Sequence, residues 1–198
     1  MIMRQVTKGI KDAVNTLTRK LTKKQIAVLA VIALALAVIF QSFIRALLSI
    51  AILFAIGAFS TYYKRKLEQL GAVGFELVTF TTTLTGVTFG PLIGALFGFA
   101  TSFISVIISR DIGPTTVFFL VASTVIGAAA MPLSSTFGIV TLGLIAVAFS
   151  TMMVHSFTFF VQAETELKIV AAAGILTNFI VNYLFLSYAA GPLLALVS

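Results

Sequence analysis

Hydroxyl side chains are concentrated in one short apolar stretch of this sequence. Six threonines fall within the ten residues from Thr79 to Thr88. In an apolar helix, threonine hydroxyls either bond back to carbonyl oxygens of their own helix or line a polar cavity. A wall formed by Thr81, Thr85 and Thr88 would offer hydrogen bonds to a small solute. The stretch therefore predicts either a substrate-binding wall or threonines that are satisfied within their own helix.

A second polar face lies near the C-terminus. Gly174, Asn178 and Asn182 are spaced by four residues, so they share one face of a helix. Amides in hydrocarbon need hydrogen-bond partners, and this face must therefore point into a bundle. Those partners are other helices or a bound solute. Asn178 and Asn182 are accordingly candidate substrate-binding residues.

Glu76 is an acidic residue at the start of the threonine stretch. Ionisable side chains inside membrane spans are costly, and each one suggests a function. Glu76 also stands close to the end of its span. There it can reach headgroup water or pair with one of three basic residues, Lys64, Arg65 and Lys66.

Catalytic patterns are missing from the sequence. It has no cysteine and a single histidine, His155, which cannot form a metal site alone. It also lacks a glycine-rich phosphate loop and paired intramembrane carboxylates. We expect no enzyme activity, no metal and no cofactor.

The amino-acid composition indicates the class of secondary structure that holds these residues. Of the 198 residues, 60% are hydrophobic and 10% are charged, with a mean hydropathy of +1.14. Soluble domains are about 45–50% apolar and 25% charged. One span needs about 20 apolar residues. The sequence therefore predicts an all-α, polytopic transmembrane helical bundle of six to seven spans over residues 25–198.

Seven spans can be drawn along the chain. Residues 26–61 are too many for one ordinary span, so we expect two helices that turn near Gln41 to Arg45; one long helix is the alternative. The predicted spans are 26–42, 44–61, 72–89, 91–109, 114–130, 137–160 and 168–188.

Basic residues are concentrated at the N-terminus. Residues 1–24 carry seven Lys or Arg against Asp12, a net charge of +6, and their apolar residues recur at helical spacing. This predicts an amphipathic helix on anionic headgroups and no nucleic-acid arm, because stacking aromatics are absent. With the N-terminus in the cytoplasm and a turn near Arg45, twelve of the thirteen basic residues lie inside.

Small residues mark possible contact faces. A stripe at four-residue spacing predicts close helix packing within the chain, or an interface between copies. It consists of Gly86, Gly90, Gly94, Gly98 and Ser102. Pro91 predicts a turn at Gly90, because proline suits the first turn of a helix. The pair Ala33 and Ala37 would suit a partner helix.

The string FGPLIGALFG at residues 89–98 resembles a motif of the substrate-binding S-components of energy-coupling-factor (ECF) vitamin transporters. The resemblance implies a small six-helix membrane protein. It would place Ala33 and Ala37 at a docking face, and Gly90, Pro91, Gly94 and Gly98 in the core near the binding cavity. Thr101 and Ser102 stand where S-components often carry an acidic residue.

Two functions are compatible with this pattern. The first is a plasma-membrane transporter subunit that binds a small solute and depends on separate energising partner subunits. The alternative is a non-transporting scaffold similar to the MreD family, which would recruit partners through the basic N-terminal helix and the small-residue faces.

Overall fold

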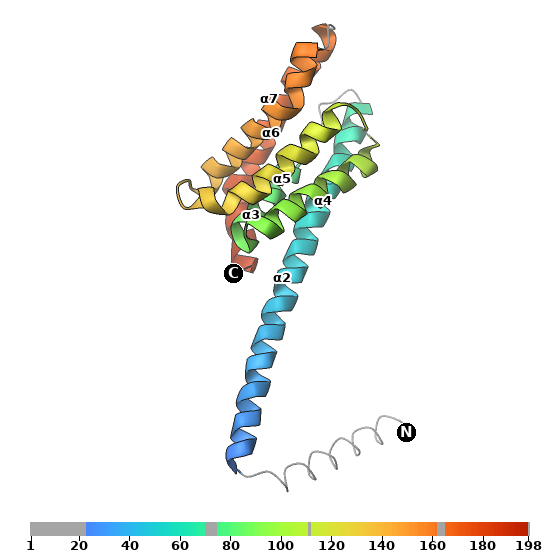
Figure 1. Ribbon diagram of the computed structural model, residues 1–198. Coiled ribbons are helices and arrows are strands. Elements are labelled where there is room, and N and C mark those ends of the chain that lie inside the picture. The colour runs from blue at the N-terminus through green and yellow to red at the C-terminus, as the bar shows by residue number, and fades with distance from the viewer. Residues whose placement is uncertain (1–22, 70–74, 111, 162–164, 198) are drawn as a thin grey trace, which may run out of the picture. The chain divides into compact units, whose positions relative to one another are not determined.

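The chain folds entirely as α-helices in the part that the structure describes. This computed structural model describes residues 23–69, 75–110, 112–161 and 165–197 (Figure 1). Its helices are α2 (Lys23–Gln69), α3 (Val78–Phe89), α4 (Pro91–Ser109), α5 (Thr115–Ser134), α6 (Ile139–Val161), α7 (Thr165–Tyr188) and α8 (Ala190–Val197). The predicted all-α class is confirmed. The predicted surface helix over residues 1–24 lies almost wholly outside the described residues.

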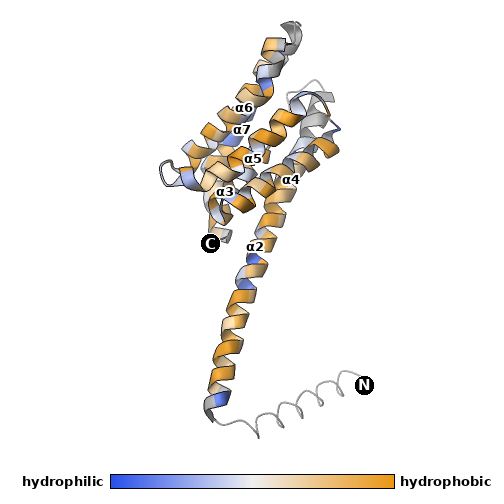
Figure 2. Cartoon of the chain, viewed as in Figure 1, coloured by the Kyte–Doolittle hydropathy of each residue, from blue (hydrophilic) through white to orange (hydrophobic). Residues whose placement is uncertain are grey.

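Five of these helices, α2, α4, α5, α6 and α7, are long and apolar enough to cross a membrane. Figure 2 shows apolar residues along all of them, with few hydrophilic positions. The protein is therefore an integral, multi-pass membrane protein. Among the described residues, α3 and α8 are shorter than one span, so five candidate spans stand against the six to seven predicted.

The predicted turn near Gln41 to Arg45 is wrong, because α2 continues through both residues. No glycine or proline occurs between Lys23 and Ile56 to break the helix. The hydroxyl of Ser42 is satisfied inside the helix, donating to the carbonyl of Val38 at 3.1 Å. If this single helix crosses the bilayer once, every later loop changes side relative to the N-terminus.

The chain divides into two compact units, residues 1–46 and residues 47–198. The described part of the first unit is the start of α2. Its large apolar side chains from Val28 to Ile44 are 41% to 68% exposed. Ala33 and Ala37 are exposed there too. This stretch of α2 thus offers an apolar surface to lipid or to another protein.

The second unit is built around α3, whose residues from Val78 to Gly86 are all buried. α3 contacts α4, α5, α6, α7 and α8. Its Phe80 and Leu84 form the core with one side chain each from α2, α4 and α7, namely Leu53, Phe97 and Leu186. Because this part of α3 has no face toward lipid, its hydroxyl groups can find partners only within the protein.

The glycine stripe lies where α3, α4 and α5 approach each other. Gly90 has a φ of 93° and joins α3 to Pro91, the first residue of α4, so the predicted turn is confirmed. A Cβ added to Gly94 would lie 2.6 Å from Cα of Gly86 and would also meet the carbonyl of Gly127. The stripe therefore packs within the chain, which is the first of the two alternatives that its spacing predicts.

Candidate functional site

Glu76 lies two residues before the first residue of α3 and stabilises the start of that helix. Its carboxylate accepts hydrogen bonds from the backbone N–H of Val78 at 2.7 Å and from the hydroxyl of Thr79 at 3.1 Å. A carboxylate at this position satisfies free N–H groups and complements the helix dipole. These contacts explain why α3 begins at Val78, six residues later than predicted.

Two amides of α7 hold the segment that leads into α3. The backbone N–H of Glu76 donates to Oδ1 of Asn178 at 3.3 Å, and Nδ2 of Asn182 donates to the carbonyl of Glu76 at 3.0 Å. The same Nδ2 reaches the backbone carbonyl of Asn178 at 2.9 Å and its Oδ1 at 3.0 Å. The prediction that this amide face points into the bundle is confirmed.

One acceptor at this site remains unused. Asn182 is fully buried, and its Oδ1 has no hydrogen-bond partner among the described residues. A buried polar atom without a partner costs about 1–3 kcal/mol. Oδ1 belongs to the same small amide group that bonds to the backbone carbonyl of Glu76, so it lies near that carbonyl. Among the described residues predicted to bind substrate, it is the one fully buried side-chain atom without a partner.

Ser60 of α2 completes the site, and sequence reasoning missed it. Its hydroxyl accepts from the backbone N–H of Leu77 at 2.8 Å and donates to the carbonyl of Gly57 at 2.7 Å. Ser60 lies two residues before Tyr62, where the apolar stretch of α2 ends. The site therefore sits near one end of the apolar part of the bundle. No pattern in the sequence distinguishes Ser60 from other helix serines.

The three threonines predicted to line a cavity bond to their own helix. Thr81 donates to the carbonyl of Leu77 at 3.0 Å, and Thr85 donates to that of Thr81 at 2.8 Å. Thr88 donates to the carbonyl of Leu84 at 2.8 Å. Thr81 and Thr85 are fully buried, while Thr88 is partly buried. Their hydroxyl protons are therefore committed within α3.

Four other hydroxyls are buried without a hydrogen-bond partner among the described residues, and their spacing in the sequence does not distinguish them from paired hydroxyls. Thr82 and Ser123 both lie next to Gly98, in the closely packed region of α3, α4 and α5. The four are Thr82, Thr101, Ser105 and Ser123. Each is at most 1% exposed.

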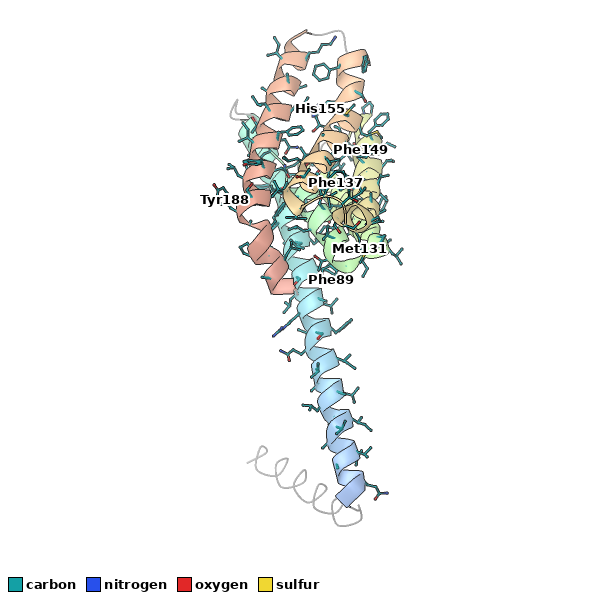
Figure 3. All side chains as sticks on the ribbon, turned by 90° about the vertical axis from the view of Figure 1, so that its left-hand side faces the viewer. Phe89, Met131, Phe137, Phe149, His155 and Tyr188 are labelled. Carbon is teal, nitrogen blue, oxygen red and sulfur yellow. The ribbon has the colours of Figure 1, made fainter. Side chains whose placement is uncertain are left out.

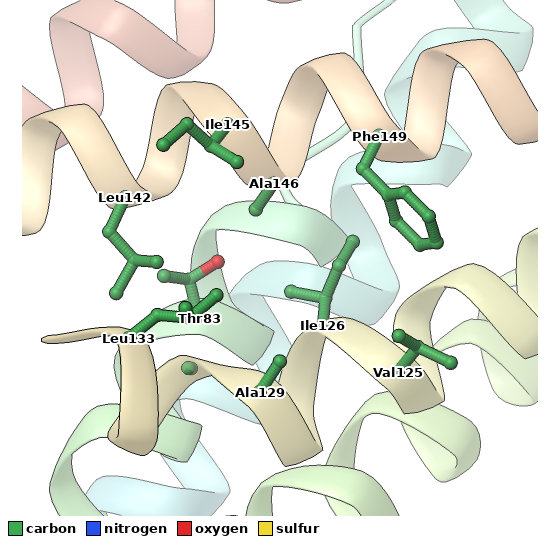
Figure 4. Close-up of a pocket in the computed structure, with 10 residues that line it drawn as sticks. Thr83, Val125, Ile126, Ala129, Leu133, Leu142, Ile145, Ala146 and Phe149 are labelled. Atoms are coloured by element: carbon green, nitrogen blue, oxygen red, sulfur yellow. The ribbon is translucent and has the colours of Figure 1, made fainter. Parts of the chain in front are cut away.

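A cavity of about 200 Å³ lies between α5 and α6, with one residue of α3 at its base (Figure 4). Thr83 is the single polar residue in its lining, and its hydroxyl donates to the carbonyl of Thr79 at 2.8 Å. The other lining residues are Val125, Ile126, Ala129, Ala130, Leu133, Leu142, Ile145, Ala146 and Phe149. This lining suits hydrocarbon rather than a polar solute.

The structure describes one more candidate from the sequence. His155 lies on α6 (Figure 3). No group of three or more metal-ligating side chains occurs within the described parts of the chain. The side chains of Lys64, Arg65 and Lys66 lie outside the description, so their predicted pairing with Glu76 stays a prediction.

Comparison of the chain with protein-family profiles, with curated proteins and with solved structures gave no match. The assignment that follows is therefore argued from the residues and geometry of this chain. Its starting points are the buried network of Glu76, Asn178 and Asn182, and the exposed apolar surface of α2.

Proposed function

We propose that the protein is the solute-binding membrane subunit of a transporter. The observation that carries this proposal is the unpaired Oδ1 of Asn182 near the backbone carbonyl of Glu76. An amide oxygen that is buried without a partner inside a membrane bundle is expensive to keep. A solute that donates a hydrogen bond to it would recover this cost on binding. Asn178 and Ser60 hold the neighbouring backbone of residues 76 and 77 in place.

The arrangement of helices supports the same proposal. With residues 26–61 in one helix, six helices run from α2 to α7, the number that the resemblance to S-components implies. The string FGPLIGALFG spans the turn from α3 to α4, and its Gly94 and Gly98 face the interior. Thr101 and Ser102 remain a departure from that family.

Energy for transport would come from partner subunits, because the sequence has no ATP-binding motif. Ala33 and Ala37 on the exposed surface of α2 are the residues proposed to face such a partner. We place the protein in the plasma membrane with its N-terminus in the cytoplasm. If α2 crosses once, the site near Ser60 then lies toward the external face, where a solute is captured.

The test is a thermal-unfolding screen of the purified, detergent-solubilised protein against a broad set of metabolites. A ligand at about 100 times its Kd stabilises the folded state by about 2.7 kcal/mol. We expect at least one compound to raise the Tm of the wild type and not that of Asn182→Leu. Tyr183→Phe is the matched control, since Tyr183 is 49% exposed. A screen without any stabilising compound contradicts solute binding.

A second candidate, the MreD-like scaffold, is favoured by two observations. The hydroxyls of Thr81, Thr85 and Thr88 are used within α3, and the first half of α2 exposes apolar side chains. A scaffold would show partners that co-purify with the wild type and are lost in Ala33→Leu/Ala37→Leu. It would show no metabolite that stabilises the chain.

A further inference from the structure

We propose that the cavity between α5 and α6 is a binding site for one acyl chain of a membrane lipid. The cavity has a volume of about 200 Å³ and shares no residue with the network of Glu76, Asn178 and Asn182. This site lies beyond the proposed function and does not depend on it. Three properties of the cavity point to an acyl chain: the chemistry of its lining, its shape and the surface onto which it opens.

The lining of the cavity offers almost no hydrogen bonds. Thr83 is its single polar residue, and the hydroxyl proton of Thr83 is donated to the carbonyl of Thr79 at 2.8 Å. A buried water needs about two to four polar partners, and only the Thr83 oxygen is present to bond it. An apolar cavity of about 150 Å³ stays dry and binds molecules such as benzene. The ligand that suits this cavity is therefore hydrocarbon.

The cavity is elongated along the two helices. Its lining runs from Val125 to Leu133 on α5 and from Leu142 to Phe149 on α6. At 1.5 Å per residue, the stretch on α5 covers about 12 Å of the helix axis. A volume of about 200 Å³ spread over this length is long and narrow. It therefore fits a stretch of an alkyl chain better than a compact ring.

Small side chains on both helices create this space. The methyl groups of Ala129 on α5 and Ala146 on α6 both point into it (Figure 4). Atoms that line an empty cavity lose dispersion contacts on that side. A hydrocarbon chain that enters the cavity restores these contacts without placing any polar group in an apolar environment.

The cavity opens onto a surface that faces lipid. Val125, Ile145 and Phe149 line it and are 45%, 41% and 37% exposed. Because α5 and α6 are both long and apolar enough to cross a membrane, hydrocarbon surrounds such exposed apolar side chains. The cavity is thus continuous with the contact between protein and lipid. An acyl chain reaches it without leaving the membrane.

The experiment is photo-crosslinking of the full chain in vesicles of phosphatidylcholine. A small share of the lipid carries a diazirine in the middle of one acyl chain, and the adducts are mapped to residues by mass spectrometry. Four lining residues are at most 6% exposed, so lipid reaches them only if a chain enters the cavity: Ile126, Ala130, Leu142 and Ala146. We expect adducts on these four residues.

Two residues of α5 are internal controls in the wild type. Ala122 is fully buried and does not line the cavity, so it should stay unlabelled. Val121 is 46% exposed, so the surrounding lipid should label it. Labelling of Val121 without labelling of the four buried lining residues overturns the proposal, and this result needs no variant.

A variant with a filled cavity links the labelling to this site. Ala129→Leu/Ala146→Leu replaces two methyl groups of the lining by isobutyl groups. It is expected to lose the adducts on Ile126 and Leu142 and to keep those on the exposed surface of α5. Ala100→Leu, at an exposed position of α4 outside the lining, is the matched control and is expected to keep both. Unchanged labelling of Ile126 and Leu142 in the filled variant overturns the proposal.

A second arm distinguishes a lipid chain from a dissolved apolar solute. A free alkane that carries the same diazirine replaces the labelled lipid in otherwise identical vesicles. Labelling of the four buried residues by the alkane and not by the lipid assigns the cavity to an apolar solute and overturns the lipid assignment. Labelling by the lipid supports it, with or without labelling by the alkane.

Discussion

Nδ2 of Asn182 donates a hydrogen bond of 3.0 Å to the carbonyl oxygen of Glu76, a residue 106 positions earlier in the chain. This bond ties α7 to the segment that starts α3. Interhelical hydrogen bonds in membrane proteins contribute about 0.6 kcal/mol on average and up to about 1.7 kcal/mol. We therefore expect Asn182→Leu to lower the stability by about 1–2 kcal/mol, measured as a lower Tm in detergent.

Tyr183→Phe controls for this substitution on the same helix. Tyr183 is the next residue and is 49% exposed, so its change should stay within about 0.5 kcal/mol. Equal stability of Asn182→Leu and Tyr183→Phe would show that the bond to Glu76 contributes nothing.

Substitution of two buried threonines, Thr101 and Thr85, by valine should change the Tm in opposite directions. The hydroxyl of Thr101 is buried without a partner, whereas that of Thr85 donates to the carbonyl of Thr81 at 2.8 Å. Removing an unpaired hydroxyl removes its desolvation cost of about 1–3 kcal/mol, so Thr101→Val should raise the Tm. Thr85→Val should lower it slightly. A fall in the Tm of Thr101→Val would show that its hydroxyl is paired.

A substitution at Gly94 tests the close packing of α3, α4 and α5. A Cβ there would meet the carbonyl of Gly127 and the Cα of Gly86, and neither backbone atom can move freely. Gly94→Ala should therefore cost about 1–3 kcal/mol. Gly138→Ala is the control, because nothing lies within 4 Å of a Cβ at Gly138. Similar Tm values for the two variants would contradict the close packing of α3, α4 and α5.

The sequence alone predicted those parts of the fold that depend on composition and on local chemistry. The high apolar content fixed the class, and Gly90 followed by Pro91 fixed the turn into α4. The continuity of α2 is only the alternative prediction, because the polar residues Gln41 and Arg45 favour a turn in the apolar stretch. Neither residue breaks a helix, and Ser42 bonds within it.

The site was predicted only in part, because its contacts join distant segments. The face of Asn178 and Asn182 follows from their spacing, but their partner, the backbone of Glu76, is more than a hundred positions away. The spacing of the threonines also does not show which of their hydroxyls bond to carbonyls of their own helix. Residues four apart share a helix face, and the same geometry lets Thr85 bond to the carbonyl of Thr81.

The cavity between α5 and α6 should accept extra volume. Ala129 lines it, while Ala122 on the same helix is fully buried and does not line it. Ala129→Leu should therefore change the stability by less than about 1.5 kcal/mol, whereas Ala122→Leu should cost about 1–3 kcal/mol through overpacking. Thermal unfolding measures both. An equal loss in the two variants would show that the cavity is filled in the folded protein.

The membrane orientation can be mapped with single cysteines, because the chain has none of its own. Gly113 and Gly138 flank α5 and have open space around a Cβ. A membrane-impermeant thiol reagent should therefore modify Gly113→Cys and Gly138→Cys from opposite faces. The seven basic residues of the N-terminal segment favour the cytoplasm.

Three helices, α2, α3 and α4, separate Lys8 from Gly113. If α3, although shorter than one span, carries the chain from one face to the other as α2 and α4 do, Lys8→Cys and Gly138→Cys should react from the cytoplasmic face and Gly113→Cys from the external face. Reaction of Gly113→Cys and Gly138→Cys from one face would contradict α5 as a span. Reaction of Lys8→Cys and Gly113→Cys from one face would mean an even number of crossings between them, as the two-helix prediction for residues 26–61 required.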